Sequence, residues 1–260
     1  MKNSHNSEDT RHIQSVFRAL KIMEYIATHE NFISLTEISK GMELSKSTTF
    51  GLIATLEQYG YMQQDPLTGK YGLGLKTFEL GQAYISRLDL REIALPEIKK
   101  LALQYQETVH LAVLFGEDVV YIDKVDGSRS IGIRSRIGGR NPAYCTGVGK
   151  VLLSGLSSQK IEQTYAGKTL QKYTNNTTTD LAELINQTQQ VYKTGYALDM
   201  EEFELGLRCI AAPIKDNKGI VIAAISLSGP ANRLLDTNIN TIAIAVAAAA
   251  MQISMRLGYK

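Results

Sequence analysis

Five consecutive polar residues, Ser45-Lys46-Ser47-Thr48-Thr49, form a stretch of this 260-residue chain that is well suited to contact an anion. They stand at the start of a segment whose apolar residues recur at helical spacing. Backbone N–H groups at a helix N-terminus attract phosphate, and the four hydroxyls and the lysine can reach phosphates or base edges in a DNA major groove. The same residues would also make an ordinary helix cap, and alone the stretch supports both interpretations equally.

Residues 34–61 around this stretch predict a helix-turn-helix. Ser34 or Thr36 can cap a first helix, and Gly41 stands where a helix end can turn left-handed, which would stop the helix. A second helix should begin at Ser45. The apolar positions expected to face the core are Leu35 and Ile38 in the first helix, and Leu52, Ile53, Leu56 and Tyr59 in the second.

A β-hairpin should follow the second helix and form a wing. Residues 60–65 and 70–73 have the character of strands, and residues 66–69 between them are typical of a turn. An amphipathic helix over residues 13–26 would complete a three-helix core. We therefore expect a winged helix-turn-helix domain over residues 12–74. Its candidate contacts to double-stranded DNA are Arg18, Thr36, Ser45, Lys46, Ser47, Thr48, Thr49 and Lys70.

The charge of the chain gives little support to a DNA-binding interpretation. The whole chain has a net charge of +2, whereas residues 1–74 hold seven Lys and Arg against eight Asp and Glu, a net charge of −1. Electrostatic affinity for DNA grows with the number of phosphates that are neutralised. Binding should therefore need two or more copies of the module, and we expect a homodimer or homotetramer.

Composition favours two domains in a cytoplasmic protein. Residues 1–11 are polar, should be disordered, and lack the features of a secretion signal. Cys145 and Cys209 are too few for a disulfide framework and are expected to be reduced thiols. The most apolar run, residues 239–253, is shorter than the roughly 20 residues that a membrane span needs, so it predicts a buried helix.

The remainder of the chain predicts a connector helix followed by an α+β domain. The connector should run over residues 75–95 and should end at Pro96, which would mark the boundary of a second domain over residues 96–260. This domain should be an antiparallel sheet with helices. Its expected helices are residues 96–106, 147–156, 181–194 and a long final one, and its expected strands are residues 109–115, 119–125, 131–135, 195–199, 207–214 and 220–227.

The sequence Gly147-Val148-Gly149-Lys150 invites comparison with phosphate-binding loops. It does not match the P-loop, because Val151 follows the lysine where the motif needs Ser or Thr. It does not match the dinucleotide-binding fingerprint either, because the third glycine of that motif is missing here. A loop of small residues at a helix start remains, and its backbone N–H groups could receive a carboxylate. Close packing of the helix end explains the glycines equally well.

A group of carboxylates near a thiol raises the hypothesis of an enzyme. Glu201, Glu202 and Glu204 lie just before Cys209. A thiol nucleophile needs a basic partner, and the one histidine in this half of the chain, His110, has no Ser or Cys pattern around it. We therefore predict no catalytic residue, no metal site and no cofactor, and we interpret Cys209 as a small packed residue.

One motif in the second half is specific. It is Glu-x-x-x-Gly-x-x-Cys-x-Ala-x-Pro, formed by Glu202, Gly206, Cys209, Ala211 and Pro213. Together with the winged helix-turn-helix, the connector, residues 147–150 and residues 225–230, it makes nearly the whole chain resemble the IclR family of bacterial transcriptional regulators.

This resemblance implies a GAF-like C-terminal domain that binds a small effector, often an organic acid, which changes operator binding. Two positions depart from the family pattern: Gly51 stands where many members have Arg in the second helix of the motif, and Asn141 stands where an apolar wall residue is common. The resemblance places the effector site at Asn141, Gly147, Val148, Asp199, Cys209, Ser226 and Ser228.

The leading hypothesis is a ligand-responsive DNA-binding regulator, more often a repressor than an activator, whose effector is a small carboxylate such as a sugar or keto acid. An enzyme that acts on a small acid, with the winged helix as a scaffold, is the alternative. A protein-interaction module is the third hypothesis, because winged helices also bind proteins.

Overall fold

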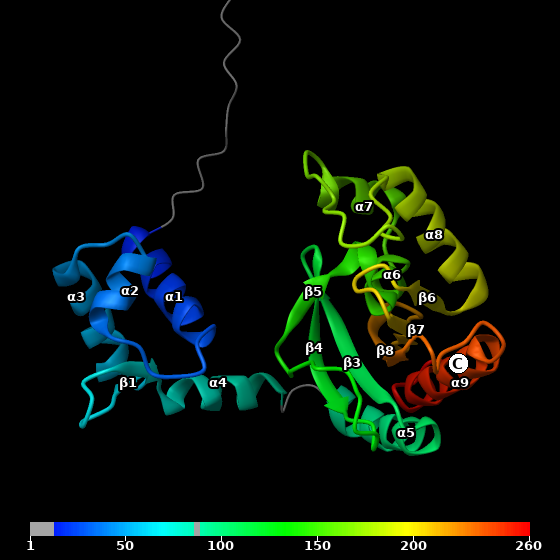
Figure 1. The fold of residues 1–260 in the computed structure, drawn as a ribbon, viewed down its shortest axis with the longest axis horizontal. Helices are drawn as coiled ribbons and strands as arrows, with labels where there is room; N and C mark the ends of the chain where they lie inside the picture. Colours follow the sequence, from blue (N-terminus) through cyan, green and yellow to red (C-terminus); the bar gives the residue numbers. More distant parts are fainter. Residues whose placement is uncertain (1–12, 86–88) are drawn as a thin grey trace, which may run out of the picture. The chain divides into compact units, whose positions relative to one another are not determined.

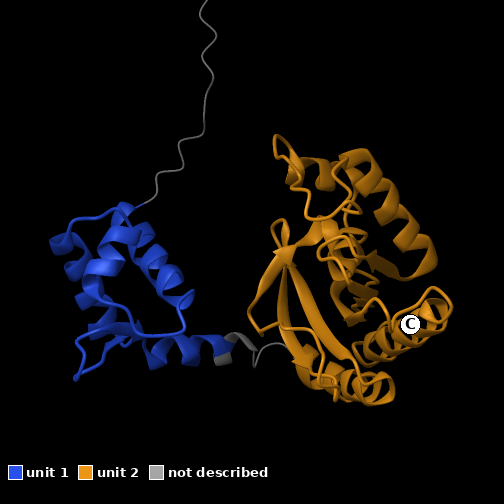
Figure 2. Ribbon diagram, in the orientation of Figure 1, with its two compact units in different colours: residues 1–88 blue, residues 89–260 orange. Residues whose placement is uncertain are grey.

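The computed structural model describes residues 13–85 and 89–260, which fall into two compact units divided between residues 88 and 89 (Figures 1 and 2). The tail expected over residues 1–11 lies outside the described residues. Each unit is a separate body with its own apolar core, as is usual for domains of this size.

Unit 1 is a winged helix-turn-helix, as predicted. Its elements are α1 (Gln14–Ala27), α2 (Leu35–Gly41), α3 (Lys46–Gln58), the antiparallel wing strands β1 (Met62–Gln64) and β2 (Tyr71–Leu73), and α4 (Leu75–Ile85). The three helices and the wing share one core, formed chiefly by Ile22, Ile26, Ile33, Ile38, Ile53, Met62 and Tyr71. Because this core fixes α3 from one side only, the first turn of α3 stays on the surface.

Two details of the helix-turn-helix differ from expectation. Gly41 is the last residue of α2 and is not left-handed, and a side chain is excluded there because a Cβ would lie 2.3 Å from Cζ of Tyr25. The left-handed residue is Glu43, at φ 54°, and an acidic side chain is an uncommon but tolerated occupant of this conformation. Tyr59 was expected in the core, but it caps the C-terminal end of α3 and is 66% exposed.

Unit 2 is an α+β domain built on a six-stranded antiparallel sheet of order β5-β4-β3-β8-β7-β6 (Figure 1). The helices α5 and α9 pack on one face of the sheet, and α6 packs on the other face beside α7 and α8. The strands are β3 (Thr108–Phe115), β4 (Asp118–Val125), β5 (Arg140–Pro142), β6 (Ala197–Met200), β7 (Leu207–Lys215) and β8 (Val221–Pro230). The helices are α5 (Asp89–Tyr105), the short 3₁₀ turn η1 (Ala143–Cys145), α6 (Gly147–Leu153), α7 (Ser158–Tyr165), α8 (Leu181–Thr194) and α9 (Ile239–Arg256).

The predicted role of Pro96 is wrong, because Pro96 lies inside α5 rather than at its start. Proline removes one helical hydrogen bond and usually breaks a helix. Here Ala94 and Ile98 on either side are completely buried, and α5 packs on α9 and β3, so tertiary contacts hold the helix through the proline. The connector helix expected over residues 75–95 is α4 up to Ile85 and the start of α5 from Asp89, and its residues 86–88 lie outside the described part. Its expected end at Pro96 is wrong, because α5 continues to Tyr105 and the two units divide between residues 88 and 89.

Two further elements of unit 2 differ from the sequence patterns. Residues 131–135 are not a strand; the edge strand next to β4 is β5, which begins at Arg140. The helix α7 was not predicted, because its apolar residues are few. The apolar run at the C-terminus is the helix α9, which is long and apolar enough by composition to cross a membrane but packs on β7, β8 and α5 as a core helix.

Candidate functional site

The first turn of α3 carries exposed hydroxyls around a helix cap. Ser45 is the N-cap, and its Oγ accepts from the backbone N of Thr48 at 3.2 Å. The same Oγ lies 3.1 Å from Oγ of Ser47 and 2.8 Å from Oγ1 of Thr48. Lys46 is exposed beside them. The cap and the anion-binding interpretations are therefore compatible, since one hydroxyl caps the helix while its neighbours stay on the surface.

Not every candidate DNA contact lies on this surface. Thr49 is completely buried, and its Oγ1 donates to the carbonyl of Ser45 at 3.0 Å, so its side chain cannot reach DNA and that prediction is wrong. Thr36 is half-buried, and the cap of α2 is Ser34, whose capping box with Glu37 is complete. Lys70 is exposed in the turn of the wing.

Gly51, on α3, faces open space. A Cβ built at this position meets no atom within 4 Å. Glycine in the middle of a helix costs about 1 kcal/mol relative to alanine, so neither packing nor backbone geometry explains it. The exposed side of α3 therefore has room for a longer side chain at this position.

Most of the predicted effector residues meet on the face of the sheet that α6 covers. In the antiparallel register, Asp199 on β6 pairs with Cys209 on β7, and Cys209 pairs with Ser228 on β8. Two residues away on the same two strands, Ser226 on β8 pairs with Ala211 on β7. Paired residues point their side chains to the same side, so Asp199, Cys209, Ser226 and Ser228 share one surface.

Gly147 lies directly over this surface. A Cβ on Gly147 would stand 3.5 Å from Cβ of Cys209 and 3.7 Å from Cβ of Asp199. Val148 follows it at the start of α6, where the first backbone N–H groups have no partner within the helix. Asn141 lies on β5, and its side chain donates to Oη of Tyr121 at 3.2 Å. The side chains of Asn141 and Tyr121 therefore lie on the same side of the sheet.

The two glycines of residues 147–150 have different roles. Thr146 caps α6, and its Oγ1 accepts from the backbone N of Gly149 at 3.2 Å. A Cβ on Gly149 would lie 2.0 Å from the carbonyl oxygen of Ala143, so Gly149 is required for close packing. A Cβ on Gly147 would meet its neighbours only at ordinary contact distances of 3.4 to 3.7 Å. Close packing therefore explains Gly149, and the carboxylate-binding interpretation of the loop stays a prediction.

Lys150 and Glu202 form a buried ion pair that the sequence analysis missed. Glu202 also donates its backbone N–H to Oδ1 of Asp199 at 2.8 Å, and its carbonyl accepts from Oγ1 of Thr177 at 2.6 Å. Glu202 is thus neutralised and fixed, and it holds Asp199 in place. The pair makes Glu202 a structural carboxylate rather than an acid–base group.

The protein environment shifts Asp199 and the two cysteines toward their protonated forms. Desolvation raises the pKa of Asp199 to about 7, and the adjacent Glu202 carboxylate acts in the same direction. Desolvation also raises the pKa of the Cys209 thiol, as does Asp199, and it raises the pKa of Cys145 to about 12. Reactive cysteines have lowered pKa values, so neither thiol is a nucleophile at neutral pH.

Two site residues were missed by the sequence analysis, His110 and Tyr121. His110 on β3 pairs with Ser226 on β8, and its Nδ1 lies 3.4 Å from Oγ of Ser228. The ring of Tyr121 lies 4.8 Å from the ring of His110, between centroids. The alternation of β3 could have shown which way His110 points, but only with the knowledge that β3 and β8 are neighbours.

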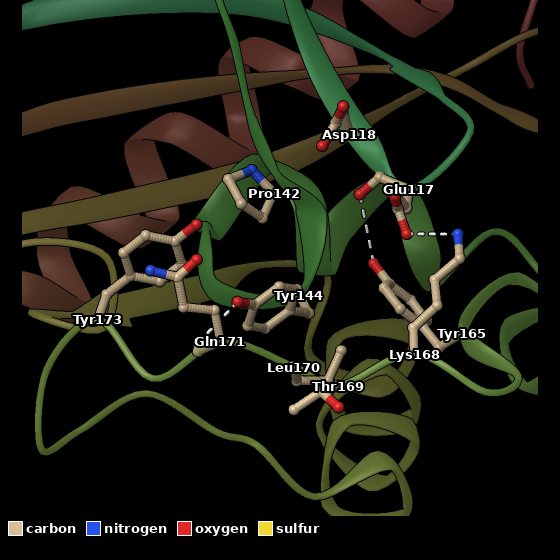
Figure 3. Close-up of a pocket in the computed structure, with 10 residues that line it drawn as sticks. All are labelled: Glu117, Asp118, Pro142, Tyr144, Tyr165, Lys168, Thr169, Leu170, Gln171 and Tyr173. Carbon is tan, nitrogen blue, oxygen red and sulfur yellow. Dashed lines mark hydrogen bonds and ion pairs between the residues drawn. The ribbon is translucent and has the colours of Figure 1, made fainter.

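A separate cavity of about 220 Å³ lies at the other side of Tyr144 (Figure 3). Oη of Tyr144 donates to the carbonyl of Gln171 at 2.6 Å, and Oη of Tyr165 donates to the carbonyl of Glu117 at 3.4 Å. Lys168 pairs with the carboxylate of Glu117 at 2.5 Å. Its principal polar groups already have partners, and its volume is below that of a usual ligand site.

Two family profiles match this chain. Residues 15–66 match the IclR helix-turn-helix domain, and residues 82–255 match the bacterial transcriptional regulator IclR C-terminal domain. The chain belongs to the IclR family. Within 13–85 and 89–260, no group of three or more His, Cys, Asp or Glu side chains could hold a metal ion.

Relatives of this IclR-family chain are similar over their whole length. The HTH-type transcriptional regulator XynR of Escherichia coli (strain K12) is 37% identical over 247 residues, covering 95% of this chain and 98% of that protein. The regulator KdgR of the same organism is 35% identical over 259 residues, covering 100% and 98%. The crystal structure of the Thermotoga maritima IclR has a TM-score of 0.76 and 31% identity, covering 95% of this chain and 100% of that one.

This IclR-family protein is therefore a DNA-binding transcriptional regulator and not an enzyme. The similarity spans both units, so the winged helix is the DNA-binding module of the family and not a scaffold for catalysis. The hypothesis of an enzyme in unit 2 is set aside on the same ground, and the protonated thiols of Cys145 and Cys209 agree with this conclusion.

Proposed function

We propose that this regulator represses transcription by binding a pseudopalindromic operator as a homodimer or homotetramer, and that a small organic acid bound in unit 2 changes this binding. One observation carries the effector site: Asp199, Cys209 and Ser228 stand in register on one face of the sheet, beneath Gly147. These side chains place donors and acceptors on one surface, where a polar ligand could bond to them.

For operator binding, α3 would enter the major groove with its first turn foremost. Ser47 and Thr48 present hydroxyls to base edges or phosphates, and Lys46 supplies a phosphate contact. Arg18 on α1 and Lys70 in the wing are the further phosphate contacts on unit 1. Because these cations are few, affinity would depend on two copies of the module.

For the effector, the acid group would lie against the backbone N–H groups of Gly147 and Val148, and its other oxygens would be bound by Ser226 and Ser228. Asp199 can accept from a hydroxyl when ionised and donate when protonated. Hydroxyls, a thiol and a carboxyl around one surface favour a hydroxy or keto acid, such as a sugar acid, over an aromatic acid without such groups.

For assembly, unit 1 carries an apolar row on the exposed side of α1. Val16, Phe17 and Leu20 recur at helical spacing and are each half-exposed or more. An exposed apolar row of this kind is typical of a surface that is covered by a partner. A second copy of this chain is the occupant that operator binding needs, since one module has too few cations.

Repression is favoured over activation by the relatives. The acetate operon repressor of Salmonella typhimurium is 34% identical over 96% of this chain, and the repressor AllR of Escherichia coli is 33% identical over 95% of it. A regulator that acts on chromosomal operators works in the cytoplasm, which is the proposed location.

The proposal is tested by fluorescence anisotropy on an operator selected from genomic fragments, with a panel of sugar, keto and aromatic acids. We expect at least one hydroxy or keto acid to change the operator affinity of the wild-type protein. The double variant Ser226→Ala/Ser228→Ala should bind the operator equally well without acid but should respond only at about tenfold higher acid concentration or more. An equal response of both proteins would place the effector elsewhere.

A further inference from the structure

His110, Tyr121 and Asn141 form a polar wall on the β3–β4–β5 side of the proposed effector site; we call these three residues the polar wall. His110 faces Ser226 and Ser228 across the pairing of β3 with β8. The Tyr121 ring lies against the His110 ring, and Asn141 donates to the Tyr121 hydroxyl. In the strand order the wall lies on β3, β4 and β5, and β8 and β7 separate it from Asp199 on β6.

We propose that the polar wall recognises hydroxyl groups on the body of the effector and so selects polyhydroxylated acids over acids with an unsubstituted carbon chain. This inference rests on the effector site proposed above. It assigns a role to His110 and Tyr121, which lie outside the set of side chains that bind the acid group and its neighbouring oxygens.

Of the two ring nitrogens of His110, only Nε2 makes a hydrogen bond of normal length. Nε2 lies 2.8 Å from Oγ of Ser135, which is a normal hydrogen bond and fixes the ring. Nδ1 lies 3.4 Å from Oγ of Ser228, beyond the usual range for an N···O hydrogen bond. A ligand hydroxyl placed beside these two atoms, rather than between them, could bond to both at about 2.8 Å.

The ring of His110 is uncharged. The residue is 3% exposed, and desolvation lowers its pKa to about 4, with the nearby Lys124 acting in the same direction and Asp126 against it. A neutral imidazole offers one donor and one acceptor. It therefore suits a hydroxyl group, which also donates and accepts, better than it suits a carboxylate.

Tyr121 offers a second hydroxyl contact. Its Oη accepts from Asn141, and no residue in the described part of unit 2 accepts the phenol proton. Tyr121 pairs with Ala112, which is two residues after His110 on β3, so the Tyr121 side chain lies on the same face of the sheet as His110 and Ser226. Desolvation raises the pKa of this phenol, and the nearby Cys209 acts in the same direction. Tyr121, Asn141 and Cys209 each keep part of their surface exposed, whereas His110 and Asp199 are buried.

Selection follows from the cost of leaving these groups without partners. A site that hydrogen-bonds a ligand hydroxyl rejects an analogue that lacks it, because the buried donors and acceptors are then desolvated and unpaired. An aliphatic acid would leave Nδ1 of His110 and the hydroxyl proton of Tyr121 desolvated and without a hydrogen-bond partner from the ligand.

The test compares two six-carbon acids, D-gluconate and hexanoate, by calorimetric titration of the full-length protein. The variants are Tyr121→Phe, which removes one oxygen atom, and His110→Phe, which removes both ring nitrogens. We expect each variant to lose about 10- to 100-fold in gluconate affinity and to bind hexanoate no more weakly than the wild type does. The matched control is Tyr144→Phe, whose hydroxyl bonds to the carbonyl of Gln171 outside the cluster and whose loss should leave gluconate affinity unchanged.

The outcomes separate this inference from the proposed function. If gluconate binds and both variants bind it as the wild type does, or lose equal affinity for both acids, the polar wall is not a recognition surface although the effector site stands. If neither acid binds the wild-type protein, the proposed effector class fails and this inference fails with it. As a measurement that needs no variant, NMR of the imidazole nitrogens should show His110 neutral down to about pH 4 and shifted by gluconate but not by hexanoate; an unshifted ring overturns the proposal.

Discussion

Nζ of Lys150 and Oε1 of Glu202 form an ion pair inside unit 2, between residues that are 52 positions apart in the chain. The pair joins the helix that begins with Gly147 to the loop that follows Asp199. Both segments border the proposed effector site, where Gly147 lies over Asp199. The pair thus ties the two most distinctive motifs of unit 2 to each other.

Removal of one partner of this pair should be strongly destabilising. Lys150→Met leaves the Glu202 carboxylate buried and uncompensated, which costs about 3–5 kcal/mol in the free energy of unfolding. The double variant Lys150→Met/Glu202→Leu, which buries no charge, should recover most of that loss. Urea titration followed by far-UV circular dichroism measures both, and a double variant that is as unstable as the single one would contradict a role for the charge.

Asp199 should make the stability of unit 2 depend on pH in an unusual direction. Its pKa is raised to about 7 from a usual value near 4. Between these values the folded state holds a proton that the unfolded state has lost, so stability falls as pH rises from about 4 to 7, and the cost is complete above pH 7. Asp199→Asn should therefore flatten the dependence and should be more stable than the wild type at pH 8, by on the order of 2–4 kcal/mol. Urea titrations at several pH values measure this, and parallel curves for the two proteins would refute it.

The two glycines at the start of α6 should respond differently to alanine. Gly149→Ala would place Cβ 2.0 Å from the Ala143 carbonyl oxygen, so it should lower the thermal midpoint of unit 2 clearly. Gly147→Ala meets its nearest atom, Cβ of Ala211, at an ordinary 3.4 Å, so the fold should be kept while the added methyl group fills the effector site. We expect at least tenfold weaker effector binding for Gly147→Ala by calorimetry, and unchanged binding would move the site away from α6.

Lys46 and Thr48 should affect operator binding by different routes. Lys46→Ala removes one phosphate contact, so it should weaken binding to all DNA sequences alike. It should also reduce the slope of log affinity against log salt concentration by roughly one. Thr48→Ala should instead relax specificity at one base pair. Thr49→Ala is the matched control, because its buried side chain can change stability but not base preference. Selection of binding sites from a random library reveals whether only Thr48→Ala changes the preferred sequence.

Gly51 offers a gain of affinity. A side chain at this position meets no atom within 4 Å, so Gly51→Ala should stabilise α3 by about 1 kcal/mol without a clash. Gly51→Arg should in addition supply a phosphate or base contact and increase the salt slope by roughly one. Comparison of the two variants by anisotropy separates the helix effect from the contact, and equal affinities would mean that this part of α3 does not reach DNA.

The sequence by itself determined the elements whose signals are local. The helix α8 runs from Leu181 to Thr194 as predicted, because its apolar positions repeat with the helical period, Asp180 caps its start and Gly195 ends it at φ 80°. The winged helix-turn-helix was predictable for the same reason, and so was Ser45 as the cap of α3. Caps, turns and periodicity depend on residues within one or two turns of each other, so they can be seen along the chain.

Only the tertiary structure decided which distant side chains meet. His110 meets Ser228 because β3 lies beside β8 in the sheet, and it meets Ser135 from the segment between β4 and β5. Lys150 meets Glu202 because α6 packs over β6 and β7. Packing within unit 1 buries Thr49, and packing on α9 and β3 within unit 2 carries α5 through Pro96, against the local preferences of both residues. Strand order and register are set by burial summed over the whole domain, whereas each residue's local preference is worth about 1 kcal/mol or less for most residues and is overruled when the core requires it.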